Sequence, residues 1–195
     1  MQDQVDARER LLNAAEKLFR DKGYNAVTMQ DVAKEVGIRQ ASLYYHITSK
    51  EQLFVEVIER ICQRHHIGLE QKLQMAEANL QSQLRAATEW FTSQPPLHLF
   101  SLMHSDLQAL SEANFQQLFA SLSQSVFAPL MQIFVTAQQQ GEIRPVAPST
   151  LAGYFLAVMD SAAFSNTRWG STAAREVIAE EMVSILVDGL RPRST

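Results

Sequence analysis

The sequence has little cysteine, glycine or proline, and each scarcity excludes a class of fold or site. Among its 195 residues there is one cysteine, Cys62, so an intrachain disulfide is excluded and a cysteine-based metal site is not expected. Seven glycines and six prolines, with few alternating runs of β-branched residues, favour an all-α fold over a β-rich one.

Long apolar runs and a secretion signal are also missing. The first ten residues, MQDQVDARER, contain no apolar core and so do not resemble a signal peptide. The longest apolar run, around residues 151–159, is too short to cross a bilayer and ends at Asp160. No membrane partner is therefore expected, and the reducing cytoplasm is the expected location.

The chain also lacks a strong positive charge. Its formal net charge is −4, with ten basic and ten acidic residues in residues 1–64 and seven against eleven in the remainder. Bulk charge alone would not indicate a nucleic-acid partner. If the protein binds nucleic acid, the placement of particular side chains must account for it.

No catalytic or metal-binding constellation appears. There is no Ser-His-Asp order, no glycine-rich phosphate loop and no spaced carboxylate pair, so neither enzyme activity nor a cofactor is expected. The histidines are not paired at a metal-ligating i, i+4 spacing, and no metal site is expected. Asp106 and Asp160 lie among apolar residues, where each is expected to orient a ligand or to pair with a neighbour.

Apolar residues recur at helical spacing along most of the chain. Asp6 and Glu9 are placed as a capping box for the first helix, and Ser49 and Gln52 for the fourth. Pro129 is expected to kink or split the seventh helix. The pattern predicts about nine helices, at approximately residues 7–22, 29–36, 39–46, 49 to at least 67, 79–92, 97–107, 112–140, 149–166 and 172–187.

Residues 28–50, TMQDVAKEVGIRQASLYYHITSK, predict two short helices joined by a tight turn. Thr28 is placed to cap the first helix, and Gly37 is placed to end it in a left-handed conformation. The second helix has one apolar anchor, Leu43, and an otherwise polar surface. A helix-turn-helix needs this division, because one helix packs while the other presents polar side chains to the DNA major groove.

This stretch resembles the DNA-binding region of the tetracycline-repressor (TetR/AcrR-type) family of bacterial transcription regulators. The matching run is T-x-x-x-V-A-x-x-V-G-I-x-x-A-S-L-Y-Y-H-I-x-S-K-E-x-L, residues 28–53, and with the preceding helix it covers roughly the first quarter of the chain. Two positions depart from the family pattern. Arg39 stands where a small hydroxyl residue is usual, and Ile47 stands where phenylalanine is usual.

The resemblance implies an N-terminal helix-turn-helix domain of three helices, residues 1–47, and a larger helical domain for ligand binding and dimerisation, residues 48–195. It implies a repressor that binds a palindromic operator in double-stranded DNA and responds to a small, largely apolar effector. The wide apolar arc of the last helix favours a homodimer formed through the last two helices. The alternative is a helical carrier of apolar small molecules in which the helix-turn-helix is only structural.

Two sets of residues are predicted to contact these partners. The DNA contacts are Gln40, Ser42 and Tyr45 on base edges, Thr28, Tyr44, His46 and Lys50 on phosphates, and Gln30, Arg39 and Ala41 on the same surface. For Arg39, a phosphate contact, a base contact and a simple exposed arginine all remain open. The effector pocket is predicted at Trp90, Phe100, Met103, His104, Phe127, Met131, Phe155 and Met159, because such side chains line adaptable apolar cavities.

Overall fold

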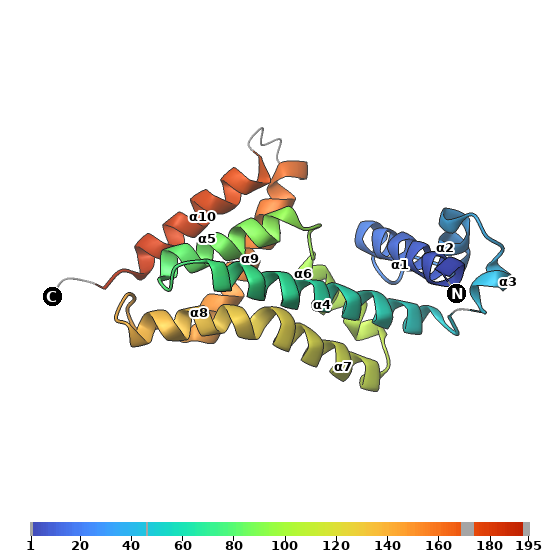
Figure 1. Ribbon diagram of the computed structural model, residues 1–195, viewed down its shortest axis with the longest axis horizontal. Helices are drawn as coiled ribbons and strands as arrows, with labels where there is room; N and C mark the ends of the chain where they lie inside the picture. The colour runs from blue at the N-terminus through green and yellow to red at the C-terminus, as the bar shows by residue number, and fades with distance from the viewer. Residues whose placement is uncertain (1, 46, 169–173, 193–195) are drawn as a thin grey trace. The chain divides into compact units, whose positions relative to one another are not determined.

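The computed structural model describes residues 2–45, 47–168 and 174–192, with side chains described except at residues 2–6, 100 and 164–168. All regular structure in this part of the chain is helical (Figure 1), which confirms the all-α prediction. The α-helices are α1 (Gln2–Lys22), α2 (Met29–Val36), α3 (Gln40–Leu43), α4 (Lys50–Met75), α5 (Leu80–Ser93), α6 (Leu99–Ser101), α7 (Glu112–Leu122), α8 (Ala128–Gln139), α9 (Pro148–Arg168) and α10 (Arg175–Leu190). Three shorter turns are the π turns η1 (Leu102–Asp106) and η3 (Ser123–Phe127) and the 3₁₀ turn η2 (Leu107–Ala109).

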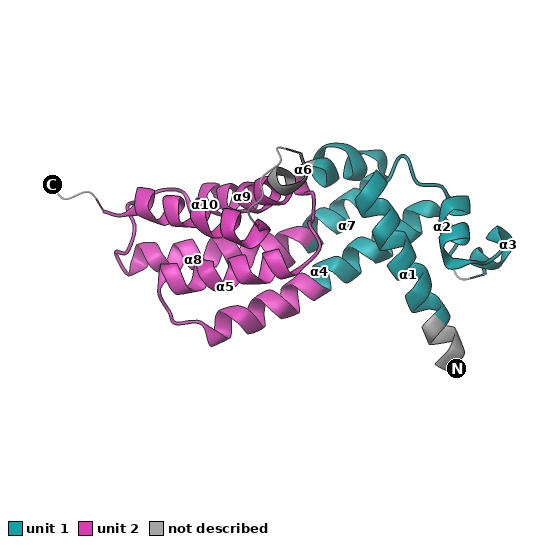
Figure 2. Cartoon of the chain, turned by 90° about the horizontal axis from the view of Figure 1, so that it is seen from above, with its two compact units in different colours: residues 1–63, 100–121 teal, residues 64–99, 122–195 magenta. Residues whose placement is uncertain are grey.

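The chain folds into two compact units (Figure 2). Unit 1 contains residues 1–63 and 100–121, and unit 2 contains residues 64–99 and 122–195. Unit 1 therefore holds the first half of α4 and a later segment in addition to the first three helices. The division predicted at residue 47 concerns function rather than internal contacts, and it stays a prediction.

In unit 1, α1, α2, α3 and the start of α4 share one apolar core. Its buried side chains include Leu11, Leu18, Phe19, Val32, Leu43 and Ile47. Val36 is half-buried, because it is the last residue of α2 and the chain turns away after it. The Phe19 ring meets Phe54 of α4 edge-on at a centroid distance of 5.0 Å, which joins α1 to α4.

Two predicted capping boxes differ from the observed helix starts. α1 is already helical before Asp6 and Glu9, so the box predicted there is wrong; no helix-breaking residue precedes it, and acidic side chains favour a helix N-terminus. At α4, the Ser49 hydroxyl accepts a hydrogen bond from the Gln52 N–H (3.0 Å), as predicted. The Gln52 side chain, however, accepts from the Thr48 N–H (3.0 Å), one residue earlier than the box requires.

The long helix predicted over residues 112–140 is divided into α7, η3 and α8. Pro129 lies in the first turn of α8, shortly after the end of the π turn η3. The π turn just before it shifts the hydrogen-bond pattern where a proline would otherwise interrupt it. The predicted effect of Pro129 is confirmed. By length and composition Glu112–Gln139 would pass as a membrane-crossing segment, but its α8 half contributes Leu130 and Phe134 to a protein core.

In unit 2, α5, α8, α9 and α10 lie side by side (Figure 2). Phe134 and Phe155 are fully buried, and Phe91 is nearly so. The rings of Phe91 and Phe155 meet edge-on at 6.0 Å, which joins α5 to α9. This core accounts for most of the apolar stripes that the sequence pattern assigned to the second half of the chain.

The second half of α4 contacts Trp90 of α5 at Gly68. A Cβ added at Gly68 would lie 2.0 Å from the Trp90 ring, so only glycine leaves room for the indole at this position. The Trp90 Nε1–H donates to Nδ1 of His65 (3.1 Å), one turn earlier on α4. His65 is buried and stacks on Phe91 at 5.3 Å. Gly68 is thus a contact point between two helices.

Gly68→Ala should therefore destabilise the protein, although alanine is the better helix former by about 1 kcal/mol. Overpacking usually costs about 1–3 kcal/mol, and the Trp90 ring would also have to leave His65. In a Trp90→Ala background the same change should instead stabilise by up to about 1 kcal/mol. Urea unfolding of the wild type, both single variants and the double variant measures this reversal of sign. A loss that persists without the ring would contradict the contact.

Candidate nucleic-acid interface

The first helix of the predicted pair is fixed by hydrogen bonds at its start and by a glycine at its end. The Thr28 hydroxyl accepts from the Asp31 N–H (3.2 Å), and the Thr28 N–H donates to Oδ2 of Asp31 (2.9 Å). Hydrogen bonds from Thr28 also lower the pKa of Asp31. Gly37 ends α2 with φ 80°, in the left-handed region. Both predicted end signals of α2 are confirmed, and its predicted bounds match the observed ones.

The second helix, α3, is short and exposed. It covers Gln40–Leu43, less than the predicted 39–46, and Leu43 is its buried anchor. Every other residue from 39 to 45 is exposed, and Tyr45 is 89% exposed. A tyrosine ring normally buries much of its apolar surface, so a ring this exposed beside polar side chains favours contact with a partner molecule.

Arg39 occupies the N-cap position of α3 without a side-chain cap hydrogen bond. The helix dipole disfavours a cation at this end, so the residue is not explained by local helix stability. Its side chain is exposed, next to Gln40, Ala41 and Ser42. This exposure beside the polar surface of α3 is consistent with a DNA contact at Arg39.

Two of the predicted phosphate contacts have partners within the chain. Lys50 Nζ donates to the Tyr24 carbonyl oxygen (3.0 Å) and lies 4.1 Å from the centroid of the Tyr24 ring. An ammonium group has three N–H donors, so Lys50 retains capacity for a phosphate. The Thr28 hydroxyl donates its one proton to Asp31 (2.6 Å), and in this arrangement it cannot also donate to a phosphate.

Two further residues predicted to contact DNA are exposed, as a DNA contact requires. Gln30 is exposed near the start of α2, and Tyr44 is 48% exposed after α3. His46 lies outside the described residues. Sequence reasoning missed Tyr24, whose backbone and ring hold Lys50; its only local signal is its place directly after the glycine that ends α1.

The helix-turn-helix and its surroundings match a known family. Residues 11–57 match the model of bacterial regulatory proteins, tetR family. The chain therefore carries a tetR-type DNA-binding region at residues 11–57. The resemblance seen in residues 28–53 is thereby confirmed.

Two named relatives are similar to this chain over less than half of its length. FasR of Mycolicibacterium smegmatis, named an HTH-type transcriptional activator, is 37% identical over 86 residues, which are 44% of this chain and 39% of FasR. IcaR of Staphylococcus epidermidis, named a negative transcriptional regulator of a biofilm operon, is 38% identical over 52 residues, 27% of this chain and 28% of IcaR. The matched part thus spans less than half of either relative.

The whole fold is also shared with a solved structure. AibR, solved in complex with isovaleryl coenzyme A and operator DNA, superposes on this chain with a TM-score of 0.75. The match covers 96% of this chain and 100% of the AibR chain, at 24% sequence identity. At this identity the likeness concerns the fold, and it covers nearly the entire chain.

The residues predicted to contact the effector belong to both units. Met103 and His104 lie on η1 of unit 1, and the side chain of Phe100 lies outside the described residues. In unit 2, Trp90 covers Gly68 and Phe155 is core. The other three predicted residues are Phe127 and Met131, half-buried against that core, and Met159, which is buried.

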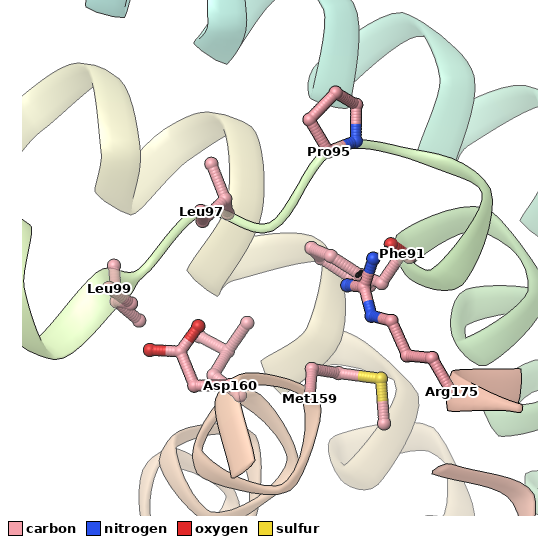
Figure 3. Close-up of a pocket in the computed structure, with 8 residues that line it drawn as sticks. Phe91, Pro95, Leu97, Leu99, Met159, Asp160 and Arg175 are labelled. Carbon is pink, nitrogen blue, oxygen red and sulfur yellow. Dashed lines mark hydrogen bonds between the residues drawn. The ribbon is translucent and has the colours of Figure 1, made fainter. Parts of the chain in front are cut away.

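A small pocket in unit 2 is lined by Met159 and by seven residues outside the set predicted to line the effector pocket (Figure 3). Its space for a water-sized molecule is about 10 Å³, roughly the minimum that one water needs. Arg175 closes one side, because its guanidinium donates to the carbonyl oxygens of Phe91 (3.0 Å) and Gln94 (2.8 Å) at the end of α5. The lining residues are Phe91, Pro95, Leu97, Leu99, Leu156, Met159, Asp160 and Arg175.

Proposed function

We propose that the protein is a transcription regulator that binds a palindromic operator in double-stranded DNA as a homodimer. The observation that carries this proposal is the exposed segment 39–45 around the single buried anchor Leu43. A short helix anchored on one side, with its polar residues and the Tyr45 ring free, has the geometry of a recognition helix in the major groove. The protein acts on DNA in the cytoplasm.

The direction of regulation differs between the two relatives, since FasR is named an activator and IcaR a negative regulator. We propose repression for this chain. Occupying an operator is sufficient to block a promoter, whereas activation needs a further surface for the transcription machinery. The DNA-binding residues described above account for the first requirement alone.

The partner in the homodimer is proposed to bind on α9 and α10. On α10, Ile178, Met182 and Ile185 are spaced by four and three residues and so share one face, and Ile185 is 70% exposed. On α9, Tyr154 is 53% exposed. A second subunit would cover these apolar side chains, and two helices from each subunit would form a four-helix interface.

The effector is proposed to be a small, largely apolar molecule, and the pocket in unit 2 supports this class. Phe91, Leu156 and Met159 supply apolar walls, while Asp160 supplies one polar group. Because the pocket has almost no free volume, a ligand can enter only if the surrounding helices move apart. Such a movement is the differential interaction that a ligand needs in order to shift a conformational equilibrium.

A selection of genomic fragments by the purified protein tests the proposed function. A regulator should enrich a short palindromic site, and the enriched duplex should bind far more tightly than random duplex at the same salt concentration. A carrier of apolar molecules would enrich no sequence. Enrichment without palindromic symmetry would contradict the dimeric mode of binding, and no enrichment at all would contradict the regulator.

A further inference from the structure

Asp106 holds the connection between α1 and α2. One carboxylate oxygen, Oδ1, accepts a hydrogen bond from the backbone N–H of Tyr24 (3.0 Å). Gly23 ends α1 with φ 78°, and a Cβ there would lie 3.3 Å from the same oxygen, so glycine provides the space for this approach. Asp106 and Tyr24 are each 8% exposed.

Tyr24 also contacts the start of α4. Its carbonyl oxygen accepts from Lys50 Nζ, the first residue of α4, and its ring lies under the same ammonium group. The ring also contacts Phe54 at a centroid distance of 4.8 Å. One residue therefore joins η1, the α1–α2 connection and the first turns of α4. Since α2 begins at the Thr28 cap, four residues later, the position of Tyr24 fixes where α2 and α3 start.

A second set of bonds ties the segment after η1 to α4. Oε1 of Glu51 accepts from the Ser111 N–H (2.8 Å), the Ser111 hydroxyl (2.6 Å) and the Asn114 side chain (2.7 Å). These bonds lower the pKa of Glu51. Residues 100–121 thus belong to unit 1, while the chain on both sides of them, residues 64–99 and 122–195, belongs to unit 2. A displacement of either flanking part is transmitted covalently to this segment.

We propose that Asp106 is a positioning residue of the DNA-binding surface. By holding the Tyr24 N–H it sets the α1–α2 connection, and through it the placement of α2 and α3 beside the start of α4. This inference rests on the proposed function. It identifies the hydrogen bond between Asp106 and Tyr24 as the contact by which residues 100–121 control DNA binding. The backbone around Asp106 changes from a π turn to a 3₁₀ turn, and such interruptions recur at functional sites and hinges.

A purely stabilising role would be better served by an uncharged side chain. Burial raises the pKa of Asp106 in the folded protein. The contribution of this carboxyl group to the free energy of unfolding is therefore fully present only at a pH below its pKa in the unfolded chain. That contribution falls as the pH rises through the folded pKa, and at neutral pH the buried charge is a cost. Asp106→Asn keeps an oxygen for the Tyr24 N–H without that charge, and should melt no lower than the wild type at pH 7.

Three variants separate positioning from stability. Asp106→Ala removes the acceptor, and Asp106→Asn retains one. Leu118→Ala removes a fully buried side chain from α7 of the same unit and no hydrogen-bonding group. For each, we would measure the affinity for the selected operator and for random duplex, the melting temperature, and amide hydrogen exchange at Tyr24. The affinities are taken well below all melting temperatures, so that every variant is folded.

Asp106→Ala should weaken operator binding by about tenfold, a usual size for coupling between two sites, and should accelerate exchange of the Tyr24 amide. Asp106→Asn should restore both. Leu118→Ala should lower the melting temperature and leave operator affinity within about twofold of the wild type, because the Tyr24 N–H keeps its acceptor.

Operator binding by Asp106→Ala at the wild-type level would overturn the inference and leave the proposed function intact. Equal losses in Asp106→Ala and Leu118→Ala would overturn it as well, since the effect would then follow stability. If the wild-type protein selects no operator, the proposed function fails and the inference fails with it.

Discussion

Ile185→Glu should dissociate the dimer. Ile185 is the most exposed apolar residue of α10, and in the proposed interface it faces the partner subunit. A glutamate there would be a buried charge without a partner, which costs about 3–5 kcal/mol. A two-fold interface contains the residue twice, so the effect is doubled within one dimer. Sedimentation velocity at several protein concentrations measures the change from dimer to monomer.

Ser184→Glu is the matched control for this experiment. It adds the same charge to the same helix at the neighbouring position, but Ser184 is an exposed polar residue away from the face of Ile178, Met182 and Ile185. The control should sediment as a dimer. If Ile185→Glu also sediments as a folded dimer, with wild-type circular dichroism, then α10 is not at the interface and its exposed apolar residues need another explanation.

Features of the fold that depend on neighbouring residues could be predicted from the sequence. The bounds of α2 match because Thr28, Asp31 and Gly37 act within a few residues of each other and encode a start and a stop locally. Pro129 divides its helix for the same reason, since the missing N–H affects its own turn. The start of α1 was misplaced because a capping box is permitted wherever its residue types occur, including inside a longer helix.

Contacts between distant residues could not be predicted in this way. Asp106 and Tyr24 are 82 positions apart, and no periodicity connects a carboxylate in one helix to a backbone N–H after another. Helix propensity alone makes Gly68 an unfavourable residue inside α4, because it takes no account of the Trp90 ring that fills the space. Tertiary contact decided both positions, and propensity is only a weak guide there.

The candidate sites show the same difference between features set by neighbouring residues and features set by tertiary contacts. The exposure of Gln40 and Tyr45 follows from a polar surface around one anchor, a pattern contained within seven residues. The effector pocket was predicted from aromatic and methionine content, which core and cavity share, and Phe155 proves to be core. The phosphate contact predicted for Lys50 took no account of its hydrogen bond to the Tyr24 carbonyl oxygen, because the two residues are distant in the sequence.

Gln40→Ala and Lys50→Ala should weaken operator binding in different ways. Gln40 is exposed at the start of α3, and its amide can pair with an adenine edge. Its loss should cost about 1–3 kcal/mol per half-site on the operator and little on random duplex, with the salt dependence almost unchanged. Lys50→Ala should weaken both duplexes and flatten the plot of log affinity against log salt by about 0.9 per phosphate contact, hence about 2 for a dimer.

Salt titrations of both variants on both duplexes measure these effects. Because Lys50 also contacts Tyr24, a further outcome is possible for Lys50→Ala. If Lys50→Ala loses affinity only for the operator and keeps the wild-type salt slope, Lys50 acts by holding Tyr24 and so positions α2 and α3, in the manner proposed for Asp106. Its melting temperature should then fall, since the Tyr24 carbonyl loses its donor. If instead Gln40→Ala weakens binding to all duplexes equally, Gln40 contacts the DNA backbone. In that case α3 enters the groove in an orientation that does not place Gln40 at a base edge.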